Sequence, residues 1–194
     1  MNKLERSDLY SLEQYAEKRN EFRSQLMQYK INRRLQIGAN ATLYFEDRMT
    51  IQYQIQEMLR IEKVFETAGI EEELETYNPL IPDGSNWKAT FMLEYDDPEE
   101  RKEQLGKLLG IDKAVWLKVG DKERITPICN EDLERETATK TSSVHFMRFE
   151  LSADMVSDLK KGATISAGIE HPSYDYSLNP IPANIQEALL KDID

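Results

Sequence analysis

The sequence predicts an α+β protein with a mostly antiparallel sheet and two long N-terminal helices that pack against the sheet or against each other. Apolar residues at helical spacing dominate the first part of the chain, and short segments of alternating apolar residues dominate the rest. These segments do not alternate regularly with helices, which favours antiparallel pairing. We expect a single domain over residues 1–194, with a mainly helical part at 1–78 and a mainly β part with an irregular tail at 79–194.

Two long helices are predicted in the N-terminal part. The first covers residues 11–34, because Ser11 can cap it, Gln14 completes a capping box, and the segment contains neither Gly nor Pro. A short strand is predicted at 41–45, before a second helix at 50–65. The apolar residues that define the stripe of this second helix are Ile51, Ile55, Met58 and Phe65. A short acidic helix that ends at Tyr77 completes this part.

Strands dominate the C-terminal part. Alternating apolar residues, with turn residues on either side, predict strands at residues 87–95, 114–119, 124–129, 143–151 and 163–169. The second and third of these strands form a predicted hairpin around Gly120 and Asp121. Helices are predicted at 98–109, 154–161 and 183–190, and the charged segment 130–142 is predicted to be a loop.

Charge and composition argue against several functional classes. The formal net charge is −11, and an acidic surface repels phosphates, so general nucleic-acid binding is not expected. No window approaches the roughly 20 apolar residues of a membrane span, and the first residues do not resemble a signal peptide. The single cysteine, Cys129, cannot form an internal disulfide and favours a cytoplasmic location. We expect its thiol to be buried and inert.

Charged residues fall on faces of both long helices where apolar residues are expected. Arg19, Arg23 and Arg34 lie on the apolar stripe of the first helix, and Glu62 lies within that of the second. One interpretation is that the helices pack together, so that Arg19 or Arg23 pairs with Glu62 or Glu57. The alternative is a polar pocket between the helices, in which the three arginines bind a small anion or the carboxylates bind a metal ion.

The two histidines allow a structural and a functional interpretation. His145 lies on the apolar face of a predicted strand, which is typical of a hydrogen-bonded core histidine. His171 precedes Pro172, which is typical of an extended residue at the end of a sheet. If the two strands are neighbours, both imidazoles can reach one site. Together with carboxylates they would then suit iron, manganese or zinc. The carboxylates concerned are Glu46, Glu57 and Glu62.

Several segments of the sequence resemble a bacterial and archaeal family catalogued as a domain of unknown function, DUF3501. They are Arg33-Arg34-Leu35, Phe45-Glu46-Asp47-Arg48 with the helix that follows to Glu62, Tyr77-Asn78-Pro79-Leu80-Ile81-Pro82, Ala89-Thr90, Ser143-Val144-His145-Phe146-Met147-Arg148-Phe149 and His171-Pro172-Ser173-Tyr174. The resemblance implies no established activity. It implies gene neighbours of the rubrerythrin-like and iron–sulfur kinds, which favour a role in peroxide or iron handling.

Three functional hypotheses follow. The first is a metal-binding protein with iron, manganese or zinc, linked to iron or peroxide and redox handling. The second is a non-enzymatic binding or scaffold protein whose acidic surface engages a redox partner. The third is a small-anion sensor that uses the inward-facing arginines. The sequence contains no nucleotide-binding glycine loop, Gly-x-Ser-x-Gly elbow or Cys-x-x-Cys pair, so no reaction is predicted, and a homodimer is plausible.

Overall fold

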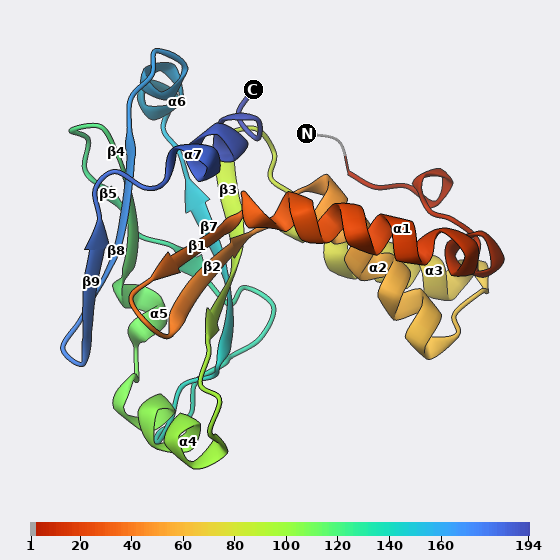
Figure 1. Cartoon of the computed structure of the whole chain (residues 1–194), viewed down its shortest axis with the longest axis horizontal. Coiled ribbons are helices and arrows are strands. Elements are labelled where there is room, and N and C mark those ends of the chain that lie inside the picture. The colour runs from red at the N-terminus through yellow and green to blue at the C-terminus, as the bar shows by residue number, and fades with distance from the viewer. Residues whose placement is uncertain (1–2) are drawn as a thin grey trace.

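The computed structural model describes residues 3–194 and contains two antiparallel sheets from which a helical arm projects (Figure 1). Sheet A contains, in order, β1 (Arg34–Ile37), β2 (Ala41–Phe45), β3 (Asn86–Leu93), β7 (Val144–Glu150) and β6 (Ile128–Cys129). Sheet B contains, in order, β5 (Arg124–Ile125), β4 (Val115–Val119), β8 (Ile165–His171) and β9 (Tyr174–Leu178). All strand pairs within these two sheets are antiparallel, which confirms the predicted fold class.

The two sheets share one hydrophobic core. In β3 every second side chain from Trp87 to Leu93 is buried, as the alternation predicts. The indole Nε1 of Trp87 donates a hydrogen bond to the carbonyl oxygen of Leu189 at 3.1 Å, which ties α7 (Ala183–Leu190) to Sheet A. The other face of β3, with Lys88 and Thr90, is half-buried. Sheet A therefore has a core face and a second face that is open to other contacts.

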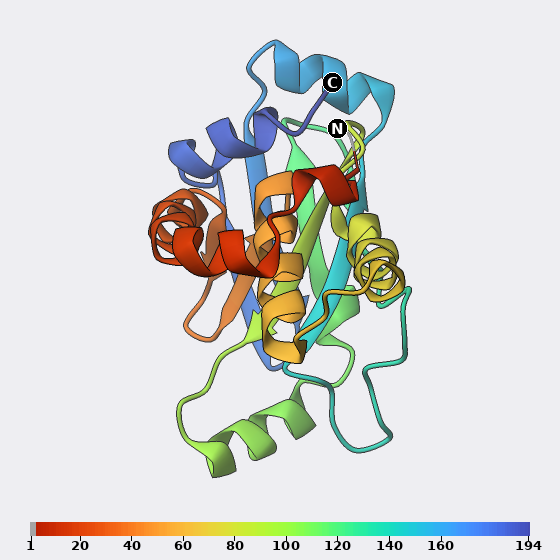
Figure 2. The same ribbon diagram turned by 90° about the vertical axis from the view of Figure 1, so that its right-hand side faces the viewer.

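The helical arm consists of α1 (Leu12–Ile31), α2 (Arg48–Glu62) and α3 (Thr67–Tyr77), with the 3-10 helices η1 (Arg6–Asp8) and η2 (Asn78–Leu80). Ser11 and Gln14 form the predicted capping box at the start of α1. The arm has a small hydrophobic core of its own, formed by Leu4, Ile51, Ile55, Leu59, Leu74 and Ile81. Figure 2 shows that α2 and α3 lie in front of Sheet A when the molecule is viewed from the side of the arm.

The remaining helices lie at the two ends of the sheets. In Figure 1, α4 (Pro98–Lys107) lies at the lower end and α6 (Ala153–Lys160) at the upper end, and the short α5 (Ile111–Ala114) precedes β4. α7 has the residue range that the sequence predicts. Within residues 3–194, no helix combines the length and the apolar character that crossing a membrane requires.

A buried ion-pair cluster joins the arm to the C-terminal segment. Arg33, at the end of α1, contacts the carboxylates of both Asp47 and Asp192. The hydroxyl of Tyr29 donates a short hydrogen bond to Asp47, and the Tyr29 ring lies beside the Arg33 guanidinium. The charged side chains of this cluster are almost fully buried, so removal of one partner would leave a buried charge unpaired.

Both long helices are shorter than predicted. α1 ends at Ile31, and Arg34 instead begins β1, where it pairs with Tyr44 of β2. The predicted mainly helical part therefore contains two strands of Sheet A. α2 ends at Glu62 because Lys63 adopts a left-handed conformation with φ 56°. Phe65 consequently lies outside the helix, and Glu62 is exposed rather than part of a buried stripe.

The C-terminal strands also differ from the prediction. Arg124–Ile125 pairs with β4 as the predicted hairpin requires, but Ile128–Cys129 leaves that hairpin and pairs with β7 in Sheet A. The predicted irregular tail contains β9, which pairs with β8, and His171 is the last residue of β8. β9 was missed because its polar sequence shows no alternation of buried residues.

Candidate functional site

The two long helices are joined by an ion pair between Arg19 and Glu57. Arg19 Nε and Nη2 lie 2.7 and 2.8 Å from the two carboxylate oxygens of Glu57. The hydroxyl of the buried Tyr15 donates a third hydrogen bond to Glu57, at 2.7 Å. The Arg19 guanidinium holds the pKa of Glu57 below its usual value. This geometry confirms the interpretation that the helices pack with an inter-helix ion pair.

The other two predicted anion-binding arginines lie in different environments. Arg23 is exposed on α1. Arg34 lies on β1, where its Nη2 is 3.9 Å from a carboxylate oxygen of Glu94 and its guanidinium lies over the ring of Tyr44. Because Arg19 is already engaged by Glu57, the three arginines do not present one common set of free donors. Binding of a small anion by these residues stays a prediction.

His145 is a fully buried core histidine held by hydrogen bonds. Its Nε2 lies 3.0 Å from the Ser142 carbonyl oxygen, which can only accept, so Nε2 carries the proton. Its Nδ1 lies 3.1 Å from the Asn130 amide nitrogen and accepts from it, and the Asp112 carboxylate lies 4.0 Å away. Burial lowers the pKa of His145, and the Asp112 charge offsets only part of this effect. The imidazole is therefore neutral at neutral pH.

The structure does not bring the two histidines together through neighbouring strands. His145 lies on β7 of Sheet A and His171 on β8 of Sheet B. His171 Nε2 donates to the carbonyl oxygen of Leu109 at 3.0 Å, and its Nδ1 accepts from the Ser173 amide. In residues 3–194 no group of three or more His, Cys, Asp or Glu side chains could hold a metal ion.

The three predicted carboxylate ligands lie in three different settings. Glu57 pairs with Arg19, and Glu62 is exposed at the end of α2. Glu46 accepts hydrogen bonds from the hydroxyls of Thr50 and Thr90, at 2.6 and 2.7 Å. Glu46 and Glu57 thus serve the packing of α2 against the sheet and against α1. Iron, manganese or zinc binding by these residues stays a prediction.

A cleft between the arm and the second face of Sheet A is a candidate site with a mainly apolar lining. We call it the arm–sheet cleft; its volume is about 470 Å³. It is lined by Gln54 of α2, Thr76 and Tyr77 of α3, Pro79 and Leu80 of η2, Lys88 of β3, Ile128 of β6, Phe146, Met147 and Arg148 of β7, and the loop residues Glu131 and Asp132. An adjoining hollow of about 410 Å³ shares the lining residues Pro79, Lys88, Glu131 and Arg148 with the cleft.

The charged side chains that line the cleft all have polar partners within the protein. Arg148 Nε and Nη2 lie 2.9 and 2.7 Å from the carboxylate oxygens of Glu131, and Arg148 also contacts Glu150. The Lys88 ammonium donates to the carbonyl oxygen of Pro79, and burial lowers the pKa of Lys88. The surface that is left for a ligand is therefore mainly apolar, with paired charges along one side.

Sequence reasoning missed this cleft because its residues come from six separate elements. None of them stands out by spacing, and Phe146 and Arg148 alternate with the core residues of β7 as any strand residues would. One signal was present: three of the segments that carry the family resemblance contribute lining residues, namely those that contain Gln54, Tyr77 and Phe146.

Comparison with known proteins identifies the same family over nearly the whole chain. The family model described as "Protein of unknown function (DUF3501)" matches residues 3–193. A crystal structure of a protein of unknown function from Burkholderia pseudomallei is similar, with 44% sequence identity and a TM-score of 0.93 over 100% of both chains. No curated protein matches the sequence.

Proposed function

The chain belongs to the DUF3501 family of proteins of unknown function, and from the arm–sheet cleft we propose that it is a non-enzymatic binding protein. The cleft takes up a short extended segment of a partner protein. That segment carries an apolar anchor residue flanked by lysine or arginine. A redox protein that displays such a segment is the partner class that the family resemblance favours.

The size and the lining of the cleft carry this proposal. Its volume of about 470 Å³ lies within the range of known ligand sites, roughly 300–1,000 Å³. Apolar side chains from both walls, including Leu80, Ile128 and Phe146, can surround one large side chain. The adjoining hollow offers a second place for a side chain next to the cleft, which suits an extended segment better than a compact small molecule.

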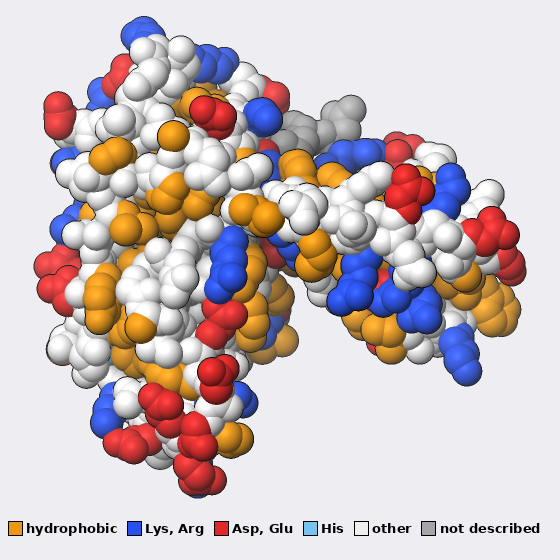
Figure 3. All heavy atoms as spheres, in the orientation of Figure 1, with side chains coloured by type: hydrophobic (Ala, Val, Ile, Leu, Met, Phe, Trp, Pro, Cys, Tyr) orange, Lys and Arg blue, Asp and Glu red, His pale blue; other side chains and the backbone are white. Residues whose placement is uncertain are grey.

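Charge selects a basic partner segment. Glu131 and Asp132 line the cleft and pair with Arg148 and Arg135, and their side chains are still about half exposed, at 55% and 44%, so a basic side chain of the partner would share these carboxylates. The whole chain has a net charge of −11, and Figure 3 shows acidic side chains gathered over α4 at the lower end of the body. The negative electrostatic field of the protein attracts basic partners as they approach. The apolar anchor residue then provides most of the binding affinity.

The metal-linked redox role expected from the histidines would need His145 to give up a hydrogen bond, because both of its ring nitrogens are engaged within the protein. Elemental analysis of protein purified with iron, manganese and zinc tests this role. Near-stoichiometric metal that disappears in both His145→Ala and His171→Ala would favour it over the binding role.

A display selection of random peptides against the immobilised protein tests the proposal. We expect enriched peptides to combine a large apolar residue with lysine or arginine, and to bind the Ile128→Glu variant poorly. Leu133→Glu is the matched control, because Leu133 is also an exposed aliphatic residue, close in the chain, and does not line the cleft. If the selection yields no sequence preference, or if the peptides bind both variants equally, the cleft is not the binding site.

A further inference from the structure

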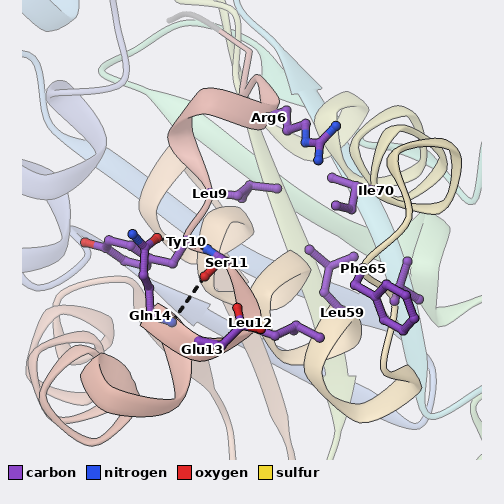
Figure 4. A pocket seen from close by; sticks show the side chains of 11 residues that line it. Arg6, Leu9, Tyr10, Ser11, Leu12, Glu13, Gln14, Leu59, Phe65 and Ile70 are labelled. Atoms are coloured by element: carbon purple, nitrogen blue, oxygen red, sulfur yellow. Dashed lines mark hydrogen bonds between the residues drawn. The ribbon is translucent and has the colours of Figure 1, made fainter.

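A second hollow, lined by apolar and polar side chains in nearly equal measure, lies at the far end of the arm and shares no residue with the arm–sheet cleft. We call it the arm-tip pocket; its volume is about 400 Å³. Figure 4 shows the side chains of Leu9, Leu12, Leu59 and Phe65 converging on it from the segment after η1, from α1, from α2 and from the segment after α2. Val64 and Ile70 complete its apolar lining.

Two large apolar side chains, one in the last turn of α2 and one just after it, are exposed, and the second of them lines this pocket. Phe65 is 71% exposed and Ile61 is 65% exposed. The left-handed conformation of Lys63 ends α2 and turns the chain, so that Val64 packs against the core of the arm while Phe65 points outward. Because Phe65 lines the hollow and is still largely exposed, a partner that covers it removes apolar surface from water.

We propose that the arm tip is a self-association surface whose occupant is a second copy of this chain. A twofold contact uses the same patch on both partners, so a protruding group and a hollow must lie side by side on one surface. Phe65 and the arm-tip pocket meet this condition. In the dimer, Phe65 of each copy enters the pocket of the other, and the two Ile61 side chains flank the contact.

The charges around the pocket favour a second copy over another partner. Arg6 and Glu13, of opposite sign, both line the pocket. A twofold axis brings Arg6 of one copy towards Glu13 of the other, so the patch is complementary to itself. Arg6 donates to the Thr67 hydroxyl at 2.6 Å through Nη1, which leaves its other donors for such a pair. A strongly basic partner, which the overall charge of −11 would attract elsewhere, gains little here.

The dimer contact and the arm–sheet cleft occupy different surfaces. Because the arm-tip pocket and the arm–sheet cleft have no lining residue in common, the dimer leaves both clefts accessible. A dimer with two clefts binds a partner with two segments more tightly than a monomer with one cleft does. Once the first segment is bound, binding of the second segment is intramolecular. The dimer itself does not depend on the function of the cleft.

Sedimentation equilibrium of the full chain over a wide concentration range tests the dimer. We expect a reversible monomer–dimer equilibrium whose dissociation constant rises by about tenfold or more in Phe65→Ser. Ile31→Ser is the matched control: Ile31 is 58% exposed on the same arm but does not line the pocket, so this variant should associate as the wild type does. Circular dichroism checks that both variants are folded.

Charge exchange gives a second, independent readout. Arg6→Glu and Glu13→Arg should each weaken the dimer, and the double variant should restore it, because the pair is rebuilt with reversed polarity. A wild-type chain that is monomeric at every concentration overturns the proposal. A dimer that persists in Phe65→Ser, or that is weakened equally by Ile31→Ser, also overturns it.

Discussion

Arg33 and Asp192, 159 residues apart in the chain, form a buried bidentate ion pair. Arg33 Nη1 and Nη2 lie 2.8 and 2.7 Å from the two oxygens of the Asp192 carboxylate, and Nη2 also lies 2.8 Å from Asp47. The pair connects the base of the arm with the end of the chain.

Replacing Arg33 with methionine should destabilise the protein strongly. Asp47 and Asp192 would keep their buried carboxylates without the guanidinium, which typically costs about 3–5 kcal/mol. Burial already raises the pKa of Asp192 above 3.8, and the loss of Arg33 raises it further. When the pKa of a carboxyl is raised in the folded state, the free energy of unfolding of the protein increases as the pH falls through that pKa. The decrease in the free energy of unfolding that Arg33→Met causes, measured by urea denaturation, should therefore be smaller at acidic pH than at neutral pH.

Arg23→Met is the control for this prediction, because Arg23 is exposed on the same helix. Its free energy of unfolding should stay within about 0.5 kcal/mol of the wild type. Equal effects of the two substitutions would show that the buried cluster does not stabilise the base of the arm.

The Arg19–Glu57 ion pair should make the packing of α1 on α2 depend on pH. The folded-state pKa of Glu57 is below its ordinary value of 4.5, chiefly because Arg19 hydrogen-bonds the charged form. The pair therefore contributes stability above pH 4.5, and this contribution is lost as the pH falls through the lowered pKa. A double-mutant cycle with Arg19→Met and Glu57→Gln measures it. A coupling free energy that does not decline in acid would contradict this expectation.

His145 should lower the stability of the protein in mild acid. Its pKa is below 6.5 in the folded state because of burial, so the unfolded chain binds the proton more readily. Stability is full above pH 6.5 and falls as the pH drops through the folded-state pKa. Asp112, Arg135 and Glu136 act on the same imidazole and set where this fall ends. His145→Gln removes this contribution, so the gap in unfolding free energy between wild type and variant should narrow from neutral to acidic pH. A difference in unfolding free energy that stays constant with pH would contradict this prediction.

Cys129 should be unreactive in the folded protein. Burial, the largest cause, raises its pKa from 9.0 to about 12, which lowers the thiolate fraction by about a thousandfold. Labelling with a thiol reagent at neutral pH should be slower in the native protein by about that factor than in the denatured protein. Native labelling at the denatured rate would show that the thiol is accessible and that the short strand β6 opens readily.

Local features of the fold could be predicted from the sequence because they depend on neighbouring residues. The capping box of Ser11 and Gln14, the alternation in β3 and the range of α7 all follow from spacing within one element. The division into two sheets could not be predicted in this way. Periodicity shows which side chains face a core, but it does not show which strand lies beside which, and so Ile128–Cys129 was assigned to the wrong hairpin.

The candidate site shows the same limit. Arg19 and Glu57 could be paired because a long helix with charge on its buried side needs a partner in a neighbouring helix. The partner of Arg33 could not be found, since nothing in the sequence places Asp192 at the base of the arm. The arm–sheet cleft arises only when α2, α3 and η2 lie across β3, β7 and β6. The ordinary strand residues Phe146 and Arg148 become candidate binding residues by that placement alone.

The dissociation constant of a display-selected peptide, measured by fluorescence anisotropy, is the most direct test of the central claim. We predict that Ile128→Glu weakens binding by about tenfold or more and that Phe146→Ala does the same, because both side chains line the cleft. Leu133→Glu, outside the cleft, should bind within about twofold of the wild type. Equal affinities for all four proteins, or an equal loss in Leu133→Glu, would contradict the claim that the arm–sheet cleft is the partner-binding site.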